Sequence, residues 1–293
     1  MRRTSLSRRT FLALAGVAPL ASRARAVSEG RPAHVPVGLE LYSLRAEEER
    51  DRKATLRAVA EMGYEGVEFW GPYFEWTAAY AREIRKELDG LGLRCFSTHT
   101  RAPHYAEDAF THVIELNQIL GSGCVVMAHP GEVEGLDGWK RVAAVLSKAY
   151  ETLRPLGIGA GFHNHLVEFK PVEGTRPIDV LTAGTPPGFH LQLDTGTCLA
   201  AGADPLAFVR ANPGRVRSYH LKDWSPDPQK GYQVLLGEGI GPWKELFEVA
   251  ETVGGVEYYL VEQEGSRFPP LETARRCLET FRAPRKTPPA SGA

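Results

Sequence analysis

The sequence predicts an α/β fold of the (β/α)8 TIM-barrel class, and three observations support this prediction. Short β-branched or aromatic runs alternate with longer stretches of helical apolar spacing, and this alternation repeats eight times. Strands that are joined by helices run parallel, and eight of them close most naturally into a barrel. The 267 residues that follow position 26 are close to the ~250 residues typical of one such barrel.

The repeating pattern sets the order of the elements. The strands are expected at Val37–Tyr42, Gly66–Trp70, Leu93–Thr98, Cys124–Ala128, Ile158–His163, Phe189–Asp194, Arg215–Leu221 and Val256–Glu262. The helices are expected near residues 52–62, 77–90, 106–120, 137–154, 177–183, 204–211, 242–253 and 270–281. Gly63 and Gly121 each follow a helical segment, as C-capping glycines do, whereas Asp204 and Pro205 together suit a helix start.

The first 26 residues are expected to be an export signal, because a basic start is followed by an apolar run from Phe11 to Leu20. Arg8 and Arg9 precede a bulky apolar pair, and this stretch resembles a bacterial twin-arginine signal. The apolar run is far short of the ~20 residues that span a bilayer, so a retained membrane anchor is the weaker interpretation. We therefore expect an exported protein, periplasmic or extracellular.

The rest of the chain is expected to form one folded domain. The predicted parts are a signal at 1–26, a linker at 27–35, the barrel at 36–283 and a disordered tail at 284–293, which is rich in Pro, Ser and Ala. Cys95, Cys124, Cys198 and Cys277 are dispersed without a Cys-x-x-Cys pair. This spacing indicates neither a disulfide framework nor a zinc knuckle, although an oxidising compartment allows one disulfide.

The charge of the chain indicates its class of partner. Of the 35 Lys and Arg residues, six lie in the predicted signal, so 29 remain against 36 Asp and Glu, a net charge near −7. Nucleic acids and anionic membranes both need clustered positive charge, so neither is an expected partner of the mature chain. A small-molecule substrate is expected instead, and the oligomeric state stays open.

Polar residues gather at the ends of the last four predicted strands, where a barrel of this class has its chemistry. They are His163, His165, Asp194, His220, Lys222, Glu262 and Glu264. Mixed imidazole and carboxylate ligands suit one divalent ion, which we expect to be Mn²⁺ or else Co²⁺, Fe²⁺, Zn²⁺ or Mg²⁺. A lone histidine at a strand end is often only hydrogen-bonded, and Asp194 before Thr-Gly could be only a helix cap. Four such residues on four successive strands favour the metal site.

Several of these segments resemble one family. They are GFHNHLVEF (161–169), LQLDTGTCLAAGADP (191–205), RVRSYHLKDW (215–224), GEG (237–239) and YYLVEQE (258–264). They resemble the later strands of the xylose-isomerase-like sugar isomerase/epimerase barrels, the AP endonuclease 2 type of superfamily, which also includes endonuclease IV. The earlier stretches VGLELYSLR, GYEGVEFWG and GLRCFSTHT agree with this resemblance.

The resemblance implies a metal held by a glutamate, an aspartate, a histidine and a glutamate on strands five to eight. Carried over by motif, the ligands are His163, Asp194, His220 and Glu262, with His163 in place of the first glutamate. In the family the two glutamates shuttle a proton while the ion polarises the neighbouring carbonyl. The substitution at His163 puts a symmetric pair of carboxylates in doubt, and Glu168 could replace the lost one from the loop.

The remaining candidates follow from the same barrel mouth. The predicted catalytic residues are Glu262, His163, Glu168 and Lys222, the last to stabilise an enolate or bind a carboxylate. The predicted substrate-binding residues are Glu40, Tyr42, Glu68, Trp70, His99, His165, Trp224 and Glu264, because aromatic faces and carboxylates suit a hydroxylated ring. His129 could belong to the same mouth, and Asn164 is expected to face away from it.

The expected function is that of a metal-dependent isomerase or epimerase that abstracts a proton next to the carbonyl of a sugar or keto-sugar. A lyase or dehydratase acting on a keto-sugar or 3-keto-glycoside is the first alternative. An endonuclease-IV-like phosphoesterase is disfavoured by the negative charge and the export signal. A non-catalytic periplasmic sugar-binding barrel is the last alternative, although it would have no need of a metal cluster.

Overall fold

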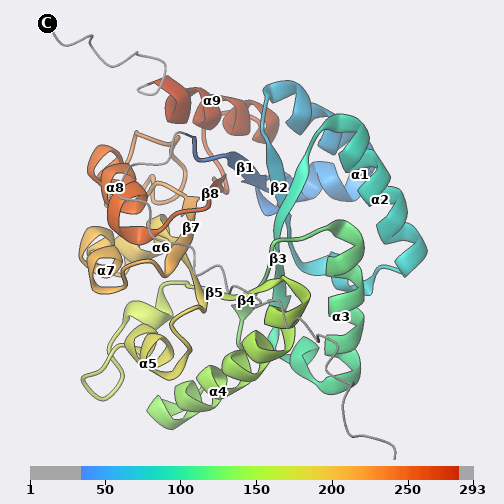
Figure 1. The fold of residues 1–293 in the computed structure, drawn as a ribbon. Coiled ribbons are helices and arrows are strands. Elements are labelled where there is room, and N and C mark those ends of the chain that lie inside the picture. Colours follow the sequence, from blue (N-terminus) through green and yellow to red (C-terminus); the bar gives the residue numbers. More distant parts are fainter. Residues whose placement is uncertain (1–33, 284–293) are drawn as a thin grey trace, which may run out of the picture. The chain divides into compact units, whose positions relative to one another are not determined.

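A computed structural model describes residues 34–283, so the predicted signal, most of the predicted linker and the predicted tail lie outside the described residues. Eight parallel strands form a closed barrel in the order β1 to β8, with helices around it (Figure 1). The strands are β1 Val37–Glu40, β2 Gly66–Phe69, β3 Arg94–Arg101, β4 Cys124–His129, β5 Gly159–His163, β6 His190–Asp194, β7 Val216–Leu221 and β8 Tyr258–Val261. The predicted fold class is confirmed, and each predicted strand is present.

The helices lie between the strands in sequence. The α-helices are α1 Arg45–Met62, α2 Ala78–Leu91, α3 Glu107–Leu120, α4 Gly135–Leu153, α5 Pro177–Gly184, α6 Thr195–Ala200, α7 Pro205–Ala211, α8 Trp243–Val249 and α9 Pro270–Arg282. Shorter helical turns are η1 Leu41–Leu44, η2 Gly71–Glu75, η3 Ala102–Tyr105, η4 Arg154–Leu156, η5 Val167–Phe169 and η6 Ala250–Gly254. The turns η1, η2 and η3 follow β1, β2 and β3 at the end of the barrel where the strands finish.

Helix α1 begins seven residues earlier than the predicted helix at 52–62, and a break inside it explains the difference. Asp51 has φ −156° and ψ 91°, which is not a helical conformation. Its side-chain Oδ1 accepts a hydrogen bond from the Ala54 backbone N–H at 2.9 Å, as an N-cap does. The predicted start therefore marks the second part of a helix that bends at Asp51.

Helix α6 was not predicted, because it is only six residues long and follows β6 without a loop. Asp194 ends β6 and also caps α6, since its Oδ1 accepts from the Thr197 backbone N–H at 2.8 Å. The helix predicted at 242–253 is α-helical only as far as Val249 and continues as the π-turn η6. A local hydrogen bond thus sets the start of α6.

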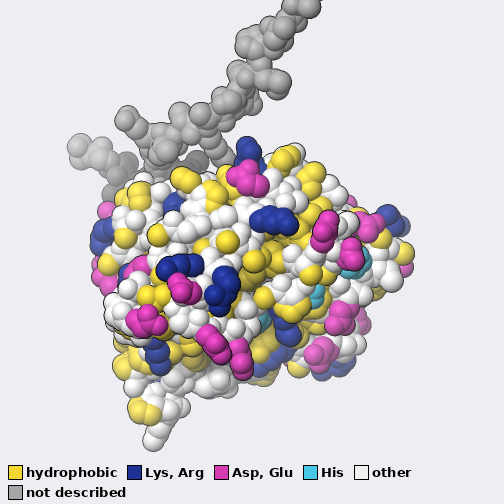
Figure 2. Space-filling view, turned by 90° about the horizontal axis from the view of Figure 1, so that it is seen from below, with side chains coloured by type: hydrophobic (Ala, Val, Ile, Leu, Met, Phe, Trp, Pro, Cys, Tyr) yellow, Lys and Arg dark blue, Asp and Glu magenta, His cyan; other side chains and the backbone are white. Residues whose placement is uncertain are grey.

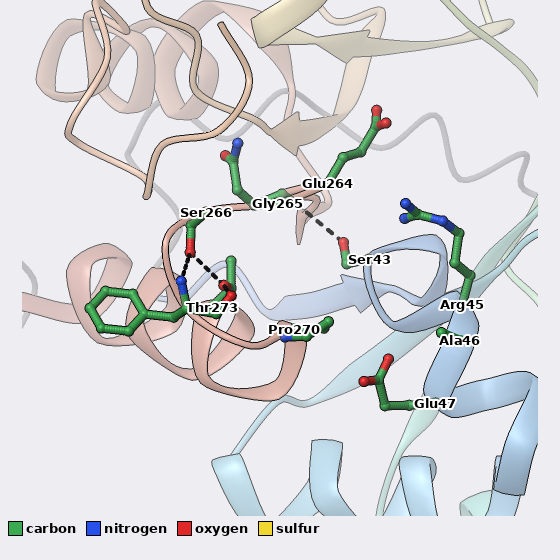
Figure 3. A pocket seen from close by; sticks show the side chains of 11 residues that line it. Ser43, Arg45, Ala46, Glu47, Glu264, Gly265, Ser266, Pro270 and Thr273 are labelled. Carbon is green, nitrogen blue, oxygen red and sulfur yellow. Dashed lines mark hydrogen bonds between the residues drawn. The ribbon is translucent and has the colours of Figure 1, made fainter. Parts of the chain in front are cut away.

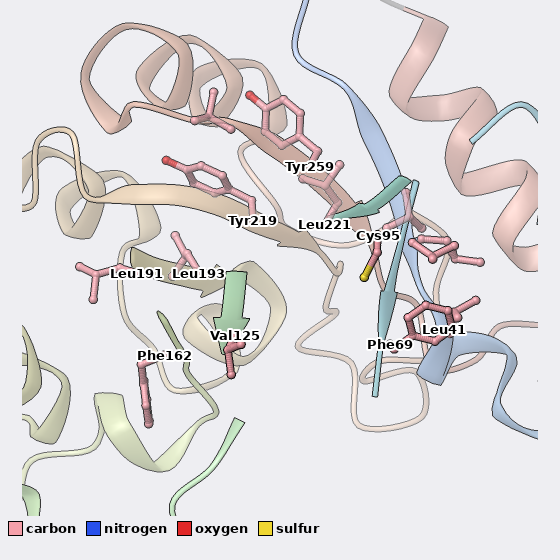
Figure 4. Packing of buried hydrophobic residues seen from close by; sticks show 14 of the residues in the cluster. Leu41, Phe69, Cys95, Val125, Phe162, Leu191, Leu193, Tyr219, Leu221 and Tyr259 are labelled. Carbon is pink, nitrogen blue, oxygen red and sulfur yellow. The ribbon is translucent and has the colours of Figure 1, made fainter. Parts of the chain in front are cut away.

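Side chains on the outer face of the strands pack against the helices and form the main hydrophobic core. Figure 4 shows Phe69, Phe162, Leu193, Tyr219 and Tyr259 among the members of this core. Tyr64 also connects distant elements, because its hydroxyl donates to the Ala274 carbonyl oxygen at 2.8 Å. This layer fixes the strands, and therefore the side chains that point to the barrel interior.

The barrel interior is apolar near the amino-terminal ends of the strands. Phe96, Tyr258 and Leu260 form a buried cluster there, and the rings of Phe96 and Tyr258 lie 5.0 Å apart. A Cβ atom on Gly38 or Gly66 would lie 2.8 or 2.7 Å from the Phe96 ring. These two glycines therefore make the space that Phe96 fills, and this end of the barrel is closed by packed side chains.

Cys95, Cys124, Cys198 and Cys277 are all buried and unpaired. Within residues 34–283, no helix is long and apolar enough to cross a membrane. Acidic and basic side chains are intermingled on the face of the molecule in Figure 2, so this face presents no continuous surface of one charge.

Candidate metal centre and active-site cavity

Four side chains meet inside the barrel where β5 to β8 end. His163, Asp194, His220 and Glu262 each offer one possible ligand atom, and these atoms all lie within 4.8 Å of one another. All four side chains are buried, and each comes from a different strand or from the residue that directly follows it. The structure thus brings together the four residues that the sequence predicts as ligands. Two imidazoles and two carboxylates fit a divalent first-row ion.

The two carboxylate oxygens of Asp194 have different surroundings. Oδ1 is the cap of α6, whereas Oδ2 lies 3.8 Å from His163 Nε2 and 3.4 Å from Lys222 Nζ. Asn164 fixes the neighbouring backbone, because its Oδ1 accepts from the Asp194 N–H at 3.0 Å and its Nδ2 donates to Thr197 Oγ1 at 3.0 Å. Asn164 thus lies outside the metal cluster but is buried, and it joins the ends of β5 and β6.

His220 is held between two carboxylates. Its Nε2 lies 2.6 Å from Glu68 Oε1, and its Nδ1 lies 2.9 Å from Glu262 Oε2. Burial disfavours the charged imidazole, but the two carboxylates outweigh this effect and raise the pKa of His220 to about 10. Without an ion, both ring nitrogens therefore carry a proton and donate to the two carboxylates. A divalent ion would take the place of the proton on Nδ1, while Nε2 would keep its hydrogen bond to Glu68, as in carboxylate–histidine–metal arrangements.

Lys222 is a buried cation among the carboxylates. Its Nζ lies 3.4 Å from both Asp194 Oδ2 and Glu262 Oε2, and it forms an ion pair with Glu264. Burial disfavours the ammonium, but these three carboxylates raise the pKa of Lys222 well above its usual value. Burial alone would raise the pKa of Glu262, but the positive charges of Lys222 and His220 have the larger effect and lower it. Glu262 is therefore an ionised carboxylate.

A cavity of about 500 Å³ lies above this cluster. It is lined by Glu40, Tyr42, Trp70, Gly71, His99, Thr100, Arg101, Ala128, His129, His163, His165, Lys222, Glu262 and Glu264. Tyr42 and Trp70 meet edge to face with ring centroids 5.1 Å apart, and Trp70 Nε1 donates to Glu48 Oε2 at 2.7 Å. The volume and the mixture of aromatic and polar groups suit a small hydroxylated molecule.

Glu40 is the most unusual group of the lining. Its side chain is fully buried, and within residues 34–283 neither carboxyl oxygen has a hydrogen-bond partner. Burial and then the charges of Glu68 and Glu262 raise the pKa of Glu40 well above its usual value. These surroundings favour the neutral carboxyl, which has a hydrogen to donate.

Two neutral imidazoles lie at the rim of the cavity. The rings of His129 and His165 stack with centroids 5.1 Å apart. Burial, followed by the nearby His129, lowers the pKa of His165 to about 3. Burial also lowers the pKa of His129. Both side chains can exchange hydrogen bonds with a substrate without a change of charge.

Three residues that were predicted to bind substrate or to act in catalysis lie away from the cavity lining. Glu68 is below it, fully buried against His99 and His220. Glu168 is buried in η5, where its Oε2 accepts from the His165 backbone N–H at 2.7 Å, so it shapes the loop. Trp224 is half-buried in the segment after β7, and its carbonyl accepts from the Ile240 N–H at 2.9 Å. The sequence places all three near the mouth but does not show which way they face.

Asp223 is a residue whose importance the sequence does not reveal. Its carboxylate accepts from the backbone N–H groups of Gly237, Gly239 and Gly241 at 2.8 to 3.1 Å, and from Trp243 Nε1 at 3.0 Å. A Cβ atom on Gly239 would lie 2.2 Å from Asp223 Oδ1. The Gly-Glu-Gly stretch therefore wraps a buried carboxylate, which orders the loop between β7 and α8.

A smaller hollow of about 140 Å³ adjoins the cavity and shares Glu264 with it (Figure 3). Ser43 and the segment after β8 form its walls, and Ser43 Oγ accepts from the Gln263 backbone N–H at 3.2 Å. Ser266 and Thr273 share a hydrogen bond at 2.6 Å on the far side. The hollow leaves open space beside Glu264.

Comparison with known families identifies the family to which this barrel belongs. Residues 56–283 match the family model described as the xylose isomerase-like TIM barrel. The chain belongs to this family. The resemblance drawn from strands five to eight is therefore confirmed at the level of the family.

Curated relatives of this family member are enzymes. Inosose dehydratase from Lacticaseibacillus casei is 24% identical over 271 residues, which cover 79% of this chain and 90% of the relative. Inosose dehydratase from Clostridium tetani is 28% identical over 154 residues, covering 46% of this chain and 51% of the relative.

Solved structures share the fold at low sequence identity. A sugar phosphate isomerase/epimerase from Parabacteroides distasonis has a TM-score of 0.74 and 23% identity, covering 86% of this chain and 95% of that chain. The IolI protein with a bound zinc atom has a TM-score of 0.67 and 14% identity, covering 84% of this chain and 96% of that chain. D-psicose 3-epimerase has a TM-score of 0.62 and 14% identity, covering 84% and 98%.

Proposed function

We propose that this family member is a divalent-metal-dependent enzyme that removes a proton next to the carbonyl of a keto-sugar or keto-polyol, and that elimination of water or another leaving group follows. The observation that carries the proposal is the cluster of His163, Asp194, His220 and Glu262 at the floor of a polar cavity. A divalent ion held there would polarise a substrate carbonyl and stabilise the negative charge that develops on its oxygen.

The side chains of the cavity supply the proton transfers. Ionised Glu262 takes the proton from the carbon next to the carbonyl. A C=C bond forms as the bond to the β-hydroxyl breaks, and protonated Glu40 gives its proton to that hydroxyl so that water leaves. The ammonium of Lys222, 3.4 Å from Glu262, adds positive charge where the enolate forms.

Elimination is favoured over epimerisation by the residue at position 163. An epimerase of the two-carboxylate type needs a second carboxylate that faces the opposite side of the substrate. Here that position is an imidazole within the candidate ligand cluster, and Glu168 is engaged in its own loop. The name inosose dehydratase, carried by the curated relatives, supports the same class of reaction.

Isomerisation or epimerisation is the second candidate, and His165 is the observation that favours it. Its neutral imidazole lines the same cavity as Glu262 and could return a proton to the enolate. The same metal cluster would serve this reaction without change.

One experiment separates the two candidates. The metal-loaded full chain would be incubated in D₂O with keto-inositols, ketohexoses and 3-keto-glycosides, and the products followed by NMR. Elimination predicts an unsaturated or rearranged product that has lost water or an aglycone. Isomerisation or epimerisation predicts solvent deuterium at the abstracted position of a sugar of unchanged composition. Absence of both with every substrate and every ion would contradict the proposal.

Hydrolysis of phosphodiesters and passive sugar binding remain the weaker alternatives. The mature chain is expected to be acidic, and charges of both signs are intermingled on the face in Figure 2, which does not favour a nucleic-acid surface. We further propose action outside the cytoplasm, because of the twin-arginine-like stretch outside the described residues. Changing Arg8 and Arg9 to lysine should then retain the protein in the cytoplasm with its activity intact. Normal export of that variant would contradict the proposed location.

A further inference from the structure

We propose that Gln192 is a positioning residue. It holds the imidazole of His163 so that Nε2 is unprotonated and faces the other residues of the candidate metal cluster. The inference rests on the metal-dependent part of the proposed function. Gln192 is fully inside the barrel, two residues before Asp194 on the same face of β6, and the substrate cavity does not reach it. It touches two histidines and one carboxylate of the site.

Glu68 fixes which way the amide of Gln192 points. Gln192 Nε2 donates to Glu68 Oε2 at 2.8 Å, and Glu68 also receives hydrogen bonds from Ser97 and His220. An ionised carboxylate only accepts, so it must face the NH₂ group of the amide and not its oxygen. The Gln192 Oε1 atom is thereby turned to the opposite side, toward β3 and β5.

The amide oxygen then fixes the imidazoles that face it. Gln192 Oε1 lies 3.0 Å from His163 Nδ1 and 2.7 Å from His99 Nε2. An amide oxygen has two lone pairs and no hydrogen, so both imidazole nitrogens are donors. With its proton on Nδ1, His163 has an unprotonated Nε2, and this atom is the one that lies 3.8 Å from Asp194 Oδ2.

The same carboxylate therefore orders both candidate histidine ligands. Glu68 accepts a hydrogen bond directly from His220 Nε2. It orders His163 indirectly, because it accepts from the amide of Gln192, whose oxygen faces His163 Nδ1. Each histidine turns its other nitrogen toward the carboxylates of the cluster. Outer hydrogen bonds of this kind fix the ring orientation and the tautomer of metal-binding histidines. A carboxylate at position 163 would need no such tautomer control, because it has no ring proton to place.

The test measures metal binding by the full chain without any substrate. Gln192→Met is close in volume but has no amide, so it should lower the affinity for Zn²⁺ or Mn²⁺ by about 10- to 100-fold. Competition with a metal indicator gives the dissociation constant. Ser218→Ala is the matched control, because it removes one buried hydrogen bond, to His190, deeper in the same barrel. This control should keep the parent affinity.

A double-mutant cycle shows whether Gln192 acts through His163. In a His163→Ala background, Gln192→Met should cost less than about threefold in metal affinity, because the imidazole that it positions is gone. An equal loss in both backgrounds would overturn the inference and indicate a general effect on the barrel.

The tautomer of His163 gives a second measurement, and its decisive part uses the unmutated chain. In ¹⁵N NMR spectra of the unmutated chain, His163 should carry its proton on Nδ1, and in Gln192→Met this preference should weaken. A proton on Nε2 of His163 in the neutral parent would overturn the inference. If the parent itself binds no metal, the metal-dependent part of the proposed function fails. If the parent binds and Gln192→Met binds equally well, only this inference fails.

Discussion

The two ends of the barrel interior contain the same residue type in opposite states. His190, near the amino-terminal ends of the strands, lies 2.7 Å from the Ser218 hydroxyl and near the Tyr258 ring. Burial and then the charge of Arg217 lower the pKa of His190 to about 3. His220, near the carboxyl-terminal ends, is equally buried, but Glu68 and Glu262 raise its pKa to about 10.

The difference shows that depth in the barrel does not determine charge. Burial by itself favours the neutral imidazole, and two carboxylates within hydrogen-bond distance reverse this preference. One end of the interior is therefore an ordinary packed core, whereas the other keeps charged groups that a core would exclude. Substitutions at the two ends should accordingly separate stability from metal binding.

The largest effect is expected from the ligand end. His220→Ala deletes a predicted ligand, so metal affinity should fall by more than the roughly 10- to 100-fold typical of outer-shell changes, and turnover should fall with it. Metal analysis of the purified variant and a titration would measure this. Asp137→Ala, on the exposed face of α4, is the control and should bind metal as the parent does. Full metal occupancy in His220→Ala would refute the assignment of this ligand.

At the packed end, Phe96→Ala should lower the free energy of unfolding by about 3–5 kcal/mol. The ring fills the space left by Gly38 and Gly66, and those backbones cannot collapse to close the cavity. Chemical denaturation would measure the loss. The metal affinity of the folded fraction should stay within about threefold of the parent's affinity. A parallel loss of metal affinity would show that the two ends are coupled.

The neutral state of His190 predicts a dependence of stability on pH. Its pKa is about 3 when folded and about 6.5 when unfolded, so below pH ~6.5 only the unfolded chain takes up the proton. The contribution of this group is complete above pH ~6.5 and is lost as the pH falls toward 3, by about 1.4 kcal/mol per pH unit. Denaturation at several pH values between 4 and 7 would measure how steeply the free energy of unfolding changes with pH. In His190→Gln this slope should be smaller by the equivalent of about one proton. An unchanged slope would mean that His190 is protonated in the fold.

The smallest effect is expected from exchanging one ligand type for another. His163→Glu should keep the ion with an affinity within about tenfold of the parent, because carboxylate oxygen and imidazole nitrogen bind such ions at similar distances, roughly 2.0–2.2 Å. Preference should shift from Zn²⁺ toward Mn²⁺, since carboxylates suit the harder ion. Competition between the two ions would measure this shift. Loss of both ions in His163→Glu would indicate that the imidazole geometry is essential.

Much of the fold could be predicted from the sequence, because eight apolar strands and their helices repeat with clear periodicity. The unpredicted elements are short and depend on local hydrogen bonds, such as the cap by Asp194 that starts α6 and the break at Asp51 in α1. Turns of three to five residues carry too few apolar positions to give a period.

The candidate site was predictable in its ligands but not in their supports. His163 and His220 end strands, so the barrel geometry alone brings them to one mouth. Gln192 is two residues before Asp194 and could have been placed on the same face, but its partners depend on which atoms of distant strands meet. Glu68 was predicted to bind substrate but lies beneath the cavity, since strand position gives the face of a side chain and not its depth.

The two oxygens of Asp194 have a consequence for how this protein can evolve. One oxygen starts α6, and the other faces the candidate metal cluster, so the helix cap and the proposed metal ligand are the same residue. Asparagine is as good an N-cap as aspartate but carries no charge. A relative that does not bind the ion could therefore carry asparagine at position 194 and still start α6.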